Sequence, residues 1–238
     1  MTTEQPPLSR HERRELERQQ QRDNYQKSTN GRKWRAISII AVIIVGFGLI
    51  IAALITRKSG NANATPVNTT VAEDWTKGQS GASKLLLVFS DFQCPACSTY
   101  EPWLNQAMTE FKDSVQFVFR DFPLRSIHPN AQIAAQAAEA AGLQGKFWEI
   151  HDKLFAKQDE WSGSSDAKAF FLQYAESLGL DKEKFETDLN SDLVKQRIED
   201  DYQSGLKAGI QGTPTFFLNG QKLKNFQSYD ELKTLLST

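Results

Sequence analysis

The sequence predicts an α/β domain with a mixed central sheet, preceded by one transmembrane helix. Strand-like and helix-like patterns alternate along residues 77–238, which is typical of this class. The dipeptide Asn219-Gly220 between two short strand-like runs indicates a hairpin, and therefore an antiparallel strand pair. Residues 36–56 carry no charged side chain over 21 positions, and a helix of that length spans about 31 Å, close to the hydrocarbon core of a bilayer.

The segment before the apolar run indicates its orientation. Residues 1–35 are rich in Gln, Glu and Arg, which predicts a polar, solvated tail in the cytoplasm. Basic side chains gather more densely just before the run (32–35) than just after it (57–58), so the C-terminal part is expected outside the cell membrane. A cleaved signal peptide is the alternative, because residues 62–64 resemble a cleavage site. Its apolar core would be only about 7–15 residues, so an uncleaved single-pass anchor is favoured.

The first elements of the globular part follow a linker. Residues 57–76 are rich in Asn, Thr, Ala and Gly, which predicts a flexible connection to a domain over 77–238. Lys84–Ser90 is a continuous apolar run, typical of a strand buried on both faces. Residues 94–112 favour a helix, and the alternation over Val115–Phe122 favours a second strand.

A block of helices follows, and then a hairpin and a last helix. Asp166 and Ser191 are residues of the kind that cap helix N-termini, and Gly142 and Gly179 are of the kind that end helices. The elements expected here are helices over 131–141, 146–155, 167–178 and 192–208, strands over 215–218 and 221–224, and a helix over 229–236.

Composition argues against two classes of protein. The chain holds 28 Lys and Arg against 29 Asp and Glu, a formal net charge of −1, so no strongly basic surface indicates a nucleic-acid partner. Cys94 and Cys97 are the whole cysteine inventory. A scaffold held together by disulfides normally has four cysteines or more, so the domain must rely on an apolar core.

The motif Cys94-Pro95-Ala96-Cys97 lies between a predicted strand and a predicted helix, which is the setting of a redox-active pair. Cys94 would begin the helix, where free N–H groups and the helix dipole favour the thiolate. Its pKa should therefore fall below the ordinary value of about 8.5. Cys97 follows one turn later and can close a disulfide with Cys94. Pro95 would occupy an early helical position, where its missing N–H costs little. Such a pair exchanges disulfides with other proteins.

A Cys-x-x-Cys motif has three other common uses. A zinc site would need a second pair of ligands, but His128 and His151 are 23 residues apart and do not have zinc-finger spacing. Haem attachment would need His at position 98, where the chain has Ser98. An inert structural disulfide is the remaining alternative. No metal ion and no cofactor is expected.

Residues 77–238 resemble the DsbA-like branch of the thioredoxin superfamily. The resemblance runs in order through FSDFQCPAC, FPLRSIHPNAQIAAQAAEAAGLQGKFWEIHDKLF and GTPTFF, and the membrane anchor is similar to that of BdbD-type members. It implies a thioredoxin fold with a helical insertion at about 129–209. It also implies that Cys94 is the solvent-accessible nucleophile and that Cys97 is the buried resolving thiol.

The same resemblance assigns roles to three prolines and their neighbours. Pro214 would be the family's cis-proline, lying against the cysteine pair, and Thr213 would offer backbone hydrogen bonds to an extended substrate. Pro102 matches the proline that kinks the active-site helix. Pro95 and Ala96, between the cysteines, would tune the redox properties of the pair. Since Ala96 replaces the histidine of the best-known member, a less depressed Cys94 pKa and a less oxidising pair are expected.

The resemblance leaves open how Cys97 loses its proton. Relatives often have a buried acid six residues before the first cysteine, where this chain has Val88. Asp91 is nearer, and a turn carboxylate is the favoured interpretation of it. The two histidines of the domain are expected to be structural. Three aromatic residues could line an apolar substrate patch, or they could pack in the core: Phe92, Trp103 and Phe216.

These observations predict an enzyme that introduces disulfides into exported proteins with cysteine thiols. The predicted topology selects oxidation, because the cell exterior is oxidising and the cytoplasm is reducing. A quinone-linked membrane partner would reoxidise the pair, and the protein is expected to be a monomer. One alternative is an isomerase or reductase using the same cysteines, although no dimerisation domain is evident in residues 57–76. Another is a non-catalytic holdase or scaffold of the cell envelope.

Overall fold

The computed structural model describes Gln19 and residues 67–237. The predicted anchor (36–56), nearly all of the predicted tail (1–35) and the first ten residues of the predicted linker lie outside the described residues, so these three assignments stay predictions. Within the described residues, no helix is long and apolar enough to cross a membrane.

A mixed sheet of five strands forms the centre of the domain, in the order β1-β3-β2-β4-β5. Strands β2 and β3 are parallel and the other neighbouring pairs are antiparallel, which confirms the predicted mixed sheet. The strands are β1 (Trp75–Gly78), β2 (Lys84–Ser90), β3 (Val115–Asp121), β4 (Thr215–Leu218) and β5 (Gln221–Lys222).

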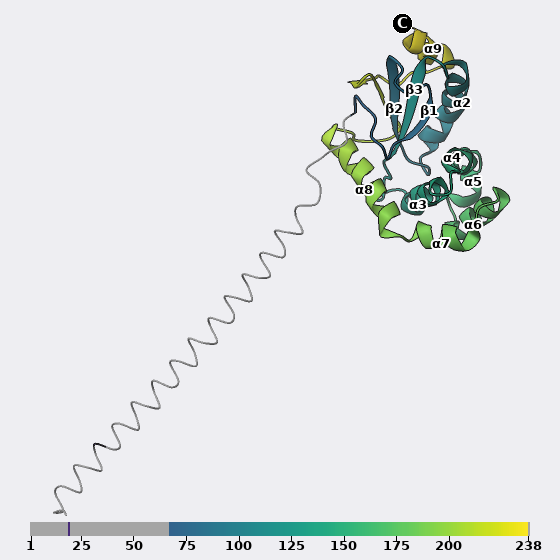
Figure 1. The fold of residues 1–238 in the computed structure, drawn as a ribbon, viewed down its shortest axis with the longest axis vertical. Coiled ribbons are helices and arrows are strands. Elements are labelled where there is room, and N and C mark those ends of the chain that lie inside the picture. Colours follow the sequence, from purple (N-terminus) through teal and green to yellow (C-terminus); the bar gives the residue numbers. More distant parts are fainter. Residues whose placement is uncertain (1–18, 20–66, 238) are drawn as a thin grey trace, which may run out of the picture. The chain divides into compact units, whose positions relative to one another are not determined.

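Helices cover both faces of this sheet (Figure 1). Helices α2 and α9 contact each other on one face, and α8 packs against β3 from the other. Between β3 and β4 the chain forms the helical insertion, of which α3 contacts each of α4, α6, α7 and α8. The helices are α2 (Pro95–Glu110), α3 (Ala131–Gly142), α4 (Phe147–Ala156), α5 (Gln158–Trp161), α6 (Ala167–Ser177), α7 (Lys182–Leu189), α8 (Asp192–Lys207) and α9 (Tyr229–Ser237).

The apolar run of β2 contributes to two separate cores, because successive side chains of a strand point to opposite faces. Leu86 and Val88 belong to the large core that includes the apolar side chains of α2 and of the insertion. Leu85, Leu87 and Phe89 belong to a smaller core under α8. The continuous apolar pattern therefore correctly predicts a strand that is covered on both faces.

Most predicted helix and turn signals are confirmed. The side chain of Asp166 accepts a hydrogen bond from the Ala169 N–H group, and that of Ser191 accepts one from the Val194 N–H group. Asn219 and Gly220 have φ values of 49° and 81°, as the tight turn of the predicted hairpin requires.

The domain begins earlier than the sequence indicated. Strand β1 starts at Trp75, inside the segment predicted to be linker and before the predicted domain start at residue 77. The Trp75 ring stacks on Phe147 with centroids 4.5 Å apart, and its Nε1–H group donates to Glu139 at 2.5 Å. A strand of four residues that is half-buried only at alternate positions gives a weak sequence pattern. Its partner on α4 lies 72 residues away in the chain, so the local composition does not reveal it.

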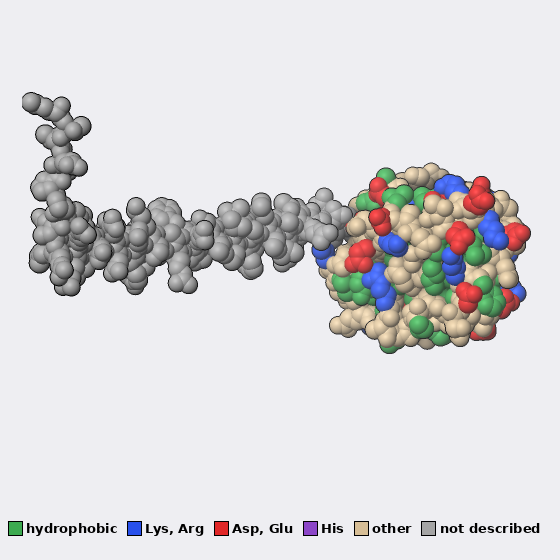
Figure 2. All heavy atoms as spheres, turned by 90° about the horizontal axis from the view of Figure 1, so that it is seen from below, with side chains coloured by type: hydrophobic (Ala, Val, Ile, Leu, Met, Phe, Trp, Pro, Cys, Tyr) green, Lys and Arg blue, Asp and Glu red, His purple; other side chains and the backbone are tan. Residues whose placement is uncertain are grey.

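Two further differences concern helix ends. The helix predicted to stop at Gly142 includes that residue, and the left-handed glycine that follows is Gly145, with φ 73°. The short helices α5 and α7 were not predicted, although Asp181 caps α7 by accepting a hydrogen bond from the Lys184 N–H group. On the face of the domain shown in Figure 2, acidic and basic side chains are interspersed.

Candidate active site

The cysteine motif lies at the junction of β2 and α2. Cys94 is the N-cap residue of α2, with φ −72° and ψ 120°, and Pro95 is the first helical residue. The Cys94 N–H group donates to the Asp91 carbonyl at 3.0 Å, which closes the turn after the strand. Proline suits the first helical turn because it has no N–H group to leave unpaired. The helix start that the sequence predicted for Cys94 is thus confirmed.

Asp91 holds this turn together with its side chain. Its Oδ1 atom accepts a hydrogen bond from the Gln93 N–H group at 2.8 Å. Its Oδ2 atom accepts one from the Leu124 N–H group at 2.9 Å and lies 2.7 Å from His128 Nδ1. These are the contacts of a turn carboxylate, as the sequence predicted, and His128 has the structural role expected of it.

The helical insertion supplies a second set of contacts to the same turn. Gln158 of α5 donates to the carbonyl oxygens of Phe92 at 2.7 Å and Cys94 at 3.0 Å. Gln93 donates to the Ser162 carbonyl at 2.7 Å and accepts from the Asn130 N–H group at 2.6 Å. Sequence reasoning missed these residues, since each bond joins positions 37 to 69 residues apart and no local pattern marks them.

The loop before β4 meets the cysteines from the other side. Strands β2 and β4 are antiparallel with Phe89 opposite Thr215, so the residues that precede β4 lie beside those that follow β2. The Thr213–Pro214 peptide bond is cis, as the resemblance implies. In its protonated form the Cys94 thiol donates a hydrogen bond to the Thr213 carbonyl oxygen, with Sγ and O 3.5 Å apart. Two predicted site residues far apart in the sequence are therefore in direct contact.

The two thiols, both free in this structure, have opposite protonation tendencies. A hydrogen bond from the Cys97 side chain lowers the pKa of Cys94 to about 5, despite an opposing effect of burial. Burial is the main cause that raises the pKa of Cys97 well above its ordinary value. At neutral pH the pair therefore consists of a Cys94 thiolate and a Cys97 thiol.

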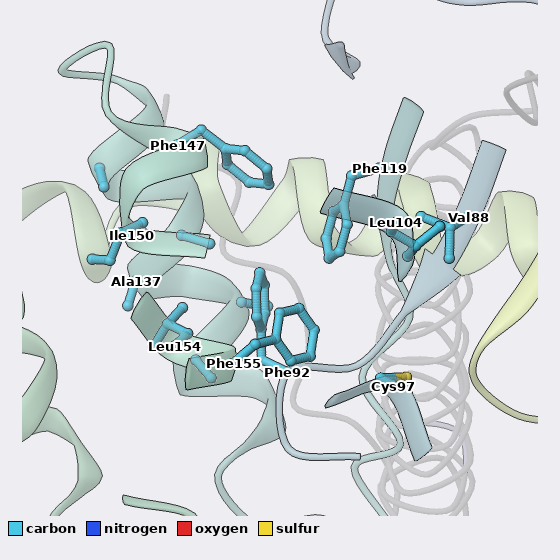
Figure 3. Packing of buried hydrophobic residues seen from close by; sticks show 14 of the residues in the cluster. Val88, Phe92, Cys97, Leu104, Phe119, Ala137, Phe147, Ile150, Leu154 and Phe155 are labelled. Carbon is cyan, nitrogen blue, oxygen red and sulfur yellow. The ribbon is translucent and has the colours of Figure 1, made fainter. Parts of the chain in front are cut away.

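The difference in exposure between the two cysteines is smaller than expected. Cys94 is 6% exposed and Cys97 is 1% exposed. Pro95 and Ala96, which lie between them, are exposed. Figure 3 shows Cys97, Val88 and Leu104 on one side of the buried cluster, across from side chains of the insertion. Cys94 is thus recessed, and the two residues after it form the outer surface of the motif.

The apolar substrate patch is not formed as proposed. Phe92 and Phe216 are fully buried, so neither is available at the surface. Phe92 packs on Phe119 and Phe155, which makes it part of the core rather than of a docking surface. Trp103 is only partly buried, at the margin of the same core. Core packing is therefore the correct interpretation for the two phenylalanines.

Comparisons with known proteins agree with this geometry. A family model described as thioredoxin matches residues 70–238. The oxidised crystal structure of BdbD from Bacillus subtilis superposes with a TM-score of 0.64 and 25% identity, covering 74% of this chain and 97% of that one. A thioredoxin-like oxidoreductase from Silicibacter pomeroyi DSS-3 gives a TM-score of 0.60 and 24% identity, covering 70% and 92% of the two chains.

Curated relatives match over a shorter part of their own length. The Na⁺/H⁺ antiporter NhaA 1 of Salinispora arenicola is 40% identical over 149 residues, which is 63% of this chain but 22% of that protein. The chain thus spans about a fifth of these relatives, and their transport activity is not transferred to it. The family model, in contrast, covers most of the chain, and the strand–Cys-x-x-Cys–helix unit and the cis-proline loop are both in place. The chain belongs to the thioredoxin superfamily, as a DsbA-like member.

Proposed function

We propose that this protein is a thiol–disulfide oxidoreductase in which Cys94 is the nucleophile and Cys97 is the resolving thiol. One observation carries the proposal. Cys94 caps a helix, receives a hydrogen bond from Cys97 and has a pKa lowered to about 5, while Cys97 stays protonated. A thiolate beside a resolving thiol is the arrangement that disulfide exchange requires.

The proposed reaction transfers two electrons from a client protein to the cysteine pair. A client thiolate attacks the Sγ atom of Cys94 in the Cys94–Cys97 disulfide, and Cys97 leaves and takes up a proton. The second client thiolate then attacks its own partner sulfur in the mixed disulfide and releases Cys94 as a thiolate. Because a thiol with a low pKa is a good leaving group, this last step is favoured, and the reduced protein is stabilised.

We propose Thr213 and Pro214 as the substrate-binding residues. The Thr213 carbonyl lies at hydrogen-bond distance from the nucleophilic sulfur, so a client chain that reaches Cys94 must pass this loop. An extended client segment could pair with the backbone there in the manner of an added strand. Pro95 and Ala96 are exposed beside Cys94, and we assign to them the tuning of its redox potential.

The direction and the place of the reaction follow from the predicted topology. Residues 36–56 would anchor the protein in the cell membrane, with the N-terminus in the cytoplasm and the catalytic domain outside. In that oxidising setting the protein would oxidise exported proteins and be reoxidised by a quinone-linked membrane partner. It would act as a monomer, without a cofactor.

The test uses the full chain in detergent, oxidised beforehand and mixed with a reduced protein that has two cysteines. Loss of client thiols should be rapid with the wild type, absent with Cys94→Ser and normal with the neighbouring control Ser98→Ala. A wild type that neither oxidises dithiols nor reduces disulfides would refute the proposal. A Cys94→Ser variant that keeps full activity in cells would instead favour a scaffold.

Thiol trapping in cells then tests the direction. A pair that is mostly oxidised at steady state supports the oxidase. A pair that is mostly reduced contradicts it and indicates a reductase or an isomerase.

A further inference from the structure

The N-terminal end of the described domain is fixed beside the β4–β5 hairpin. Val67 packs against the smaller core. Asn68 lies so close to Gly220 that a Cβ atom added to this glycine would come within 2.6 Å of the Asn68 Cβ atom. The next residue is also held, because the Thr69 carbonyl oxygen accepts a hydrogen bond from Arg120 at 3.3 Å. The chain therefore leaves the domain, towards its N-terminus, at a defined point next to the hairpin.

This point and the cysteine pair lie at opposite ends of the sheet. The hairpin adjoins the start of β2, since the Asn219 N–H group donates to the Leu85 carbonyl at 2.9 Å. Cys94 follows the other end of β2, and a strand of seven residues rises about 20 Å. A domain that is tethered beside the hairpin therefore presents Cys94 on its far side.

Lysine side chains gather at the end of the sheet where the chain leaves. Lys222 belongs to β5, and Lys224 follows it in the returning arm of the hairpin. Lys84 begins β2 and is paired with Val115 of β3, so the loop before β3, which carries Lys112, reaches the same end. We call these four lysines the lysine pole. Lys112, Lys222 and Lys224 are exposed, and none of the three forms an ion pair or a side-chain hydrogen bond with a described residue.

The charge of this end differs from that of the domain as a whole. The three loops that meet here are residues 79–83, 111–114 and 219–225, and Asp113 is the only acid in them. Residues 67–238 together hold 17 Lys and Arg against 24 Asp and Glu. A negatively charged surface therefore repels most of the domain but attracts the lysine pole, and this contrast can orient the domain.

The chain between the predicted anchor and the domain is short. The connection from Thr56, the last residue of the predicted anchor, to Val67 spans at most about 40 Å when fully extended. A domain of this size has a radius of gyration of about 15 Å, so its diameter is also roughly 40 Å. Because the connection is no longer than the domain is wide, the end to which it is fixed is held nearest to the bilayer.

We propose that the lysine pole is a lipid-binding surface, at which Lys112, Lys222 and Lys224 bind the phosphate groups of anionic phospholipids. The inference rests on the membrane anchor of the proposed function. It adds an orientation, in which Cys94 faces away from the bilayer and towards exported clients. Each lysine near an anionic surface shifts binding by about fivefold, so three of them hold the domain reversibly. The domain can therefore detach and turn Cys94 towards a partner in the membrane.

Lysine acetylation measures this contact in the full chain. The wild type is reconstituted through its anchor in bilayer nanodiscs of phosphatidylcholine alone, or of equal parts phosphatidylcholine and phosphatidylglycerol. Mass spectrometry follows the acetylation of each lysine by a water-soluble reagent. We expect Lys112, Lys222 and Lys224 to react at least about fivefold more slowly in the anionic discs. Raised salt should remove this protection, because it screens exposed charges.

Lys182 is the internal control, because it is exposed and belongs to α7. Lys84 donates to the Leu236 carbonyl at 2.6 Å, so the end of α9 lies at the lysine pole, whereas α7 lies at the opposite end of the domain (Figure 1). The rate for Lys182 should be the same in both kinds of disc. Equal rates for the three exposed pole lysines in the two kinds of disc, or equal protection of Lys182, would overturn the proposal. So would a wild type that fails to insert into the discs.

Two double variants place the same change of charge at different positions. Lys222→Glu combined with Lys224→Glu should remove the protection of Lys112, because the hairpin would then repel the anionic headgroups. The matched control combines Lys157→Glu with Lys182→Glu in the helical insertion and should leave Lys112 protected. Equal loss of protection in both double variants would show that net charge alone decides, which contradicts a specific lipid-binding surface.

A client assay on the same discs separates this proposal from the proposed function. The discs are oxidised beforehand and mixed with a reduced protein that has two cysteines. Client oxidation together with equal acetylation rates in the two kinds of disc would overturn the lipid-binding surface alone. Protected lysines without any thiol–disulfide exchange would support that surface and overturn the proposed function.

Discussion

Gln158 of the helical insertion donates a hydrogen bond of 3.0 Å to the carbonyl oxygen of Cys94. The same amide nitrogen also donates a hydrogen bond to the Phe92 carbonyl, so one side chain binds two backbone carbonyl groups of the turn between β2 and α2. The Cys94 carbonyl also accepts the first hydrogen bond of α2, from the Ser98 N–H group at 3.2 Å, whereas the Phe92 carbonyl lies outside both β2 and α2. The insertion therefore helps to position Cys94, as well as covering the core.

Replacement of Gln158 by Met should destabilise the fold and disturb Cys94. Methionine keeps the approximate shape but removes the bond to the Phe92 carbonyl and one of the two bonds to the Cys94 carbonyl, which should cost about 1–3 kcal/mol. Gln203→Met is the control, because Gln203 is exposed and its side chain bonds to Glu199 on its own helix. Urea unfolding of both variants gives the comparison. Equal stability of the two would show that the bonds from Gln158 contribute nothing.

Removal of the Cys97 thiol should raise the pKa of Cys94. The hydrogen bond from Cys97 is the largest cause of the lowered value, so in Cys97→Ala the pKa should rise from about 5 by on the order of one to two units. Thiolate absorbance near 240 nm during a pH titration measures this directly. Ser98→Ala, one residue further along the helix, should leave the midpoint near 5. A midpoint that stays near 5 in Cys97→Ala would assign the low pKa to the helix start instead.

Glu101→Gln should make the reduced protein more stable at high pH and leave it unchanged at low pH. The folded-state pKa of Glu101, about 7, lies above the ordinary value of 4.5. Its contribution is therefore fully present below about pH 4.5 and is lost as the pH rises through 7. At pH 9 the variant should exceed the wild type by about 3 kcal/mol, and at pH 4 the two should agree.

Urea unfolding at both pH values measures this difference. Cys94 has the opposite sign, because its lowered pKa adds stability as the pH rises from 5 towards 9. Since both proteins contain Cys94, its effect cancels, and the difference in their free energies of unfolding reports the contribution of Glu101 alone. A variant less stable than the wild type at pH 9 would indicate a structural carboxylate.

Gly142→Ala should weaken the junction between β1 and the insertion. A Cβ atom at Gly142 would lie 2.3 Å from the Trp75 ring, so the indole would have to leave its place on Phe147. We expect a loss of about 2 kcal/mol from overpacking, which outweighs the better helix propensity of alanine. Gly163→Ala, where no atom lies within 4 Å of the added carbon, should change stability by less than about 0.5 kcal/mol. Thermal unfolding of the two variants tests this contrast.

The sequence predicted those parts of the fold whose signals are local. The double-sided burial of β2 followed from one apolar run, and the caps at Asp166 and Ser191 followed from single residues next to helical patterns. The Cys94–Cys97 motif could be recognised from its spacing and from its place between a predicted strand and a predicted helix. In each case the cause of the structure lies within a few residues of the feature.

Features that depend on distant partners were missed. Nothing near Gln158 in the sequence marks its role, because its hydrogen-bond partners are the distant residues Phe92 and Cys94. From the sequence alone, Trp75 could not be distinguished from a linker residue, because only its contact with Phe147 shows that it belongs to the domain. For Glu101, however, a signal was present. Cys97, Glu101, Leu104 and Met108 occupy one face of α2 by their spacing, so an acid interrupts an apolar stripe.

The depth of Cys94 has a consequence for when the protein can act. Cys94 as a residue is only 6% exposed, so a client thiol on a thin, pliable segment reaches it more easily than a thiol held on the surface of a folded globular protein. Under the proposed function, whether a client cysteine reacts would depend on how far the client has folded. An unfolded chain still emerging from export could present its cysteines to Cys94, and the same chain after folding could not. Burial of the nucleophile would thus spare the thiols of completed proteins without any recognition of their sequence.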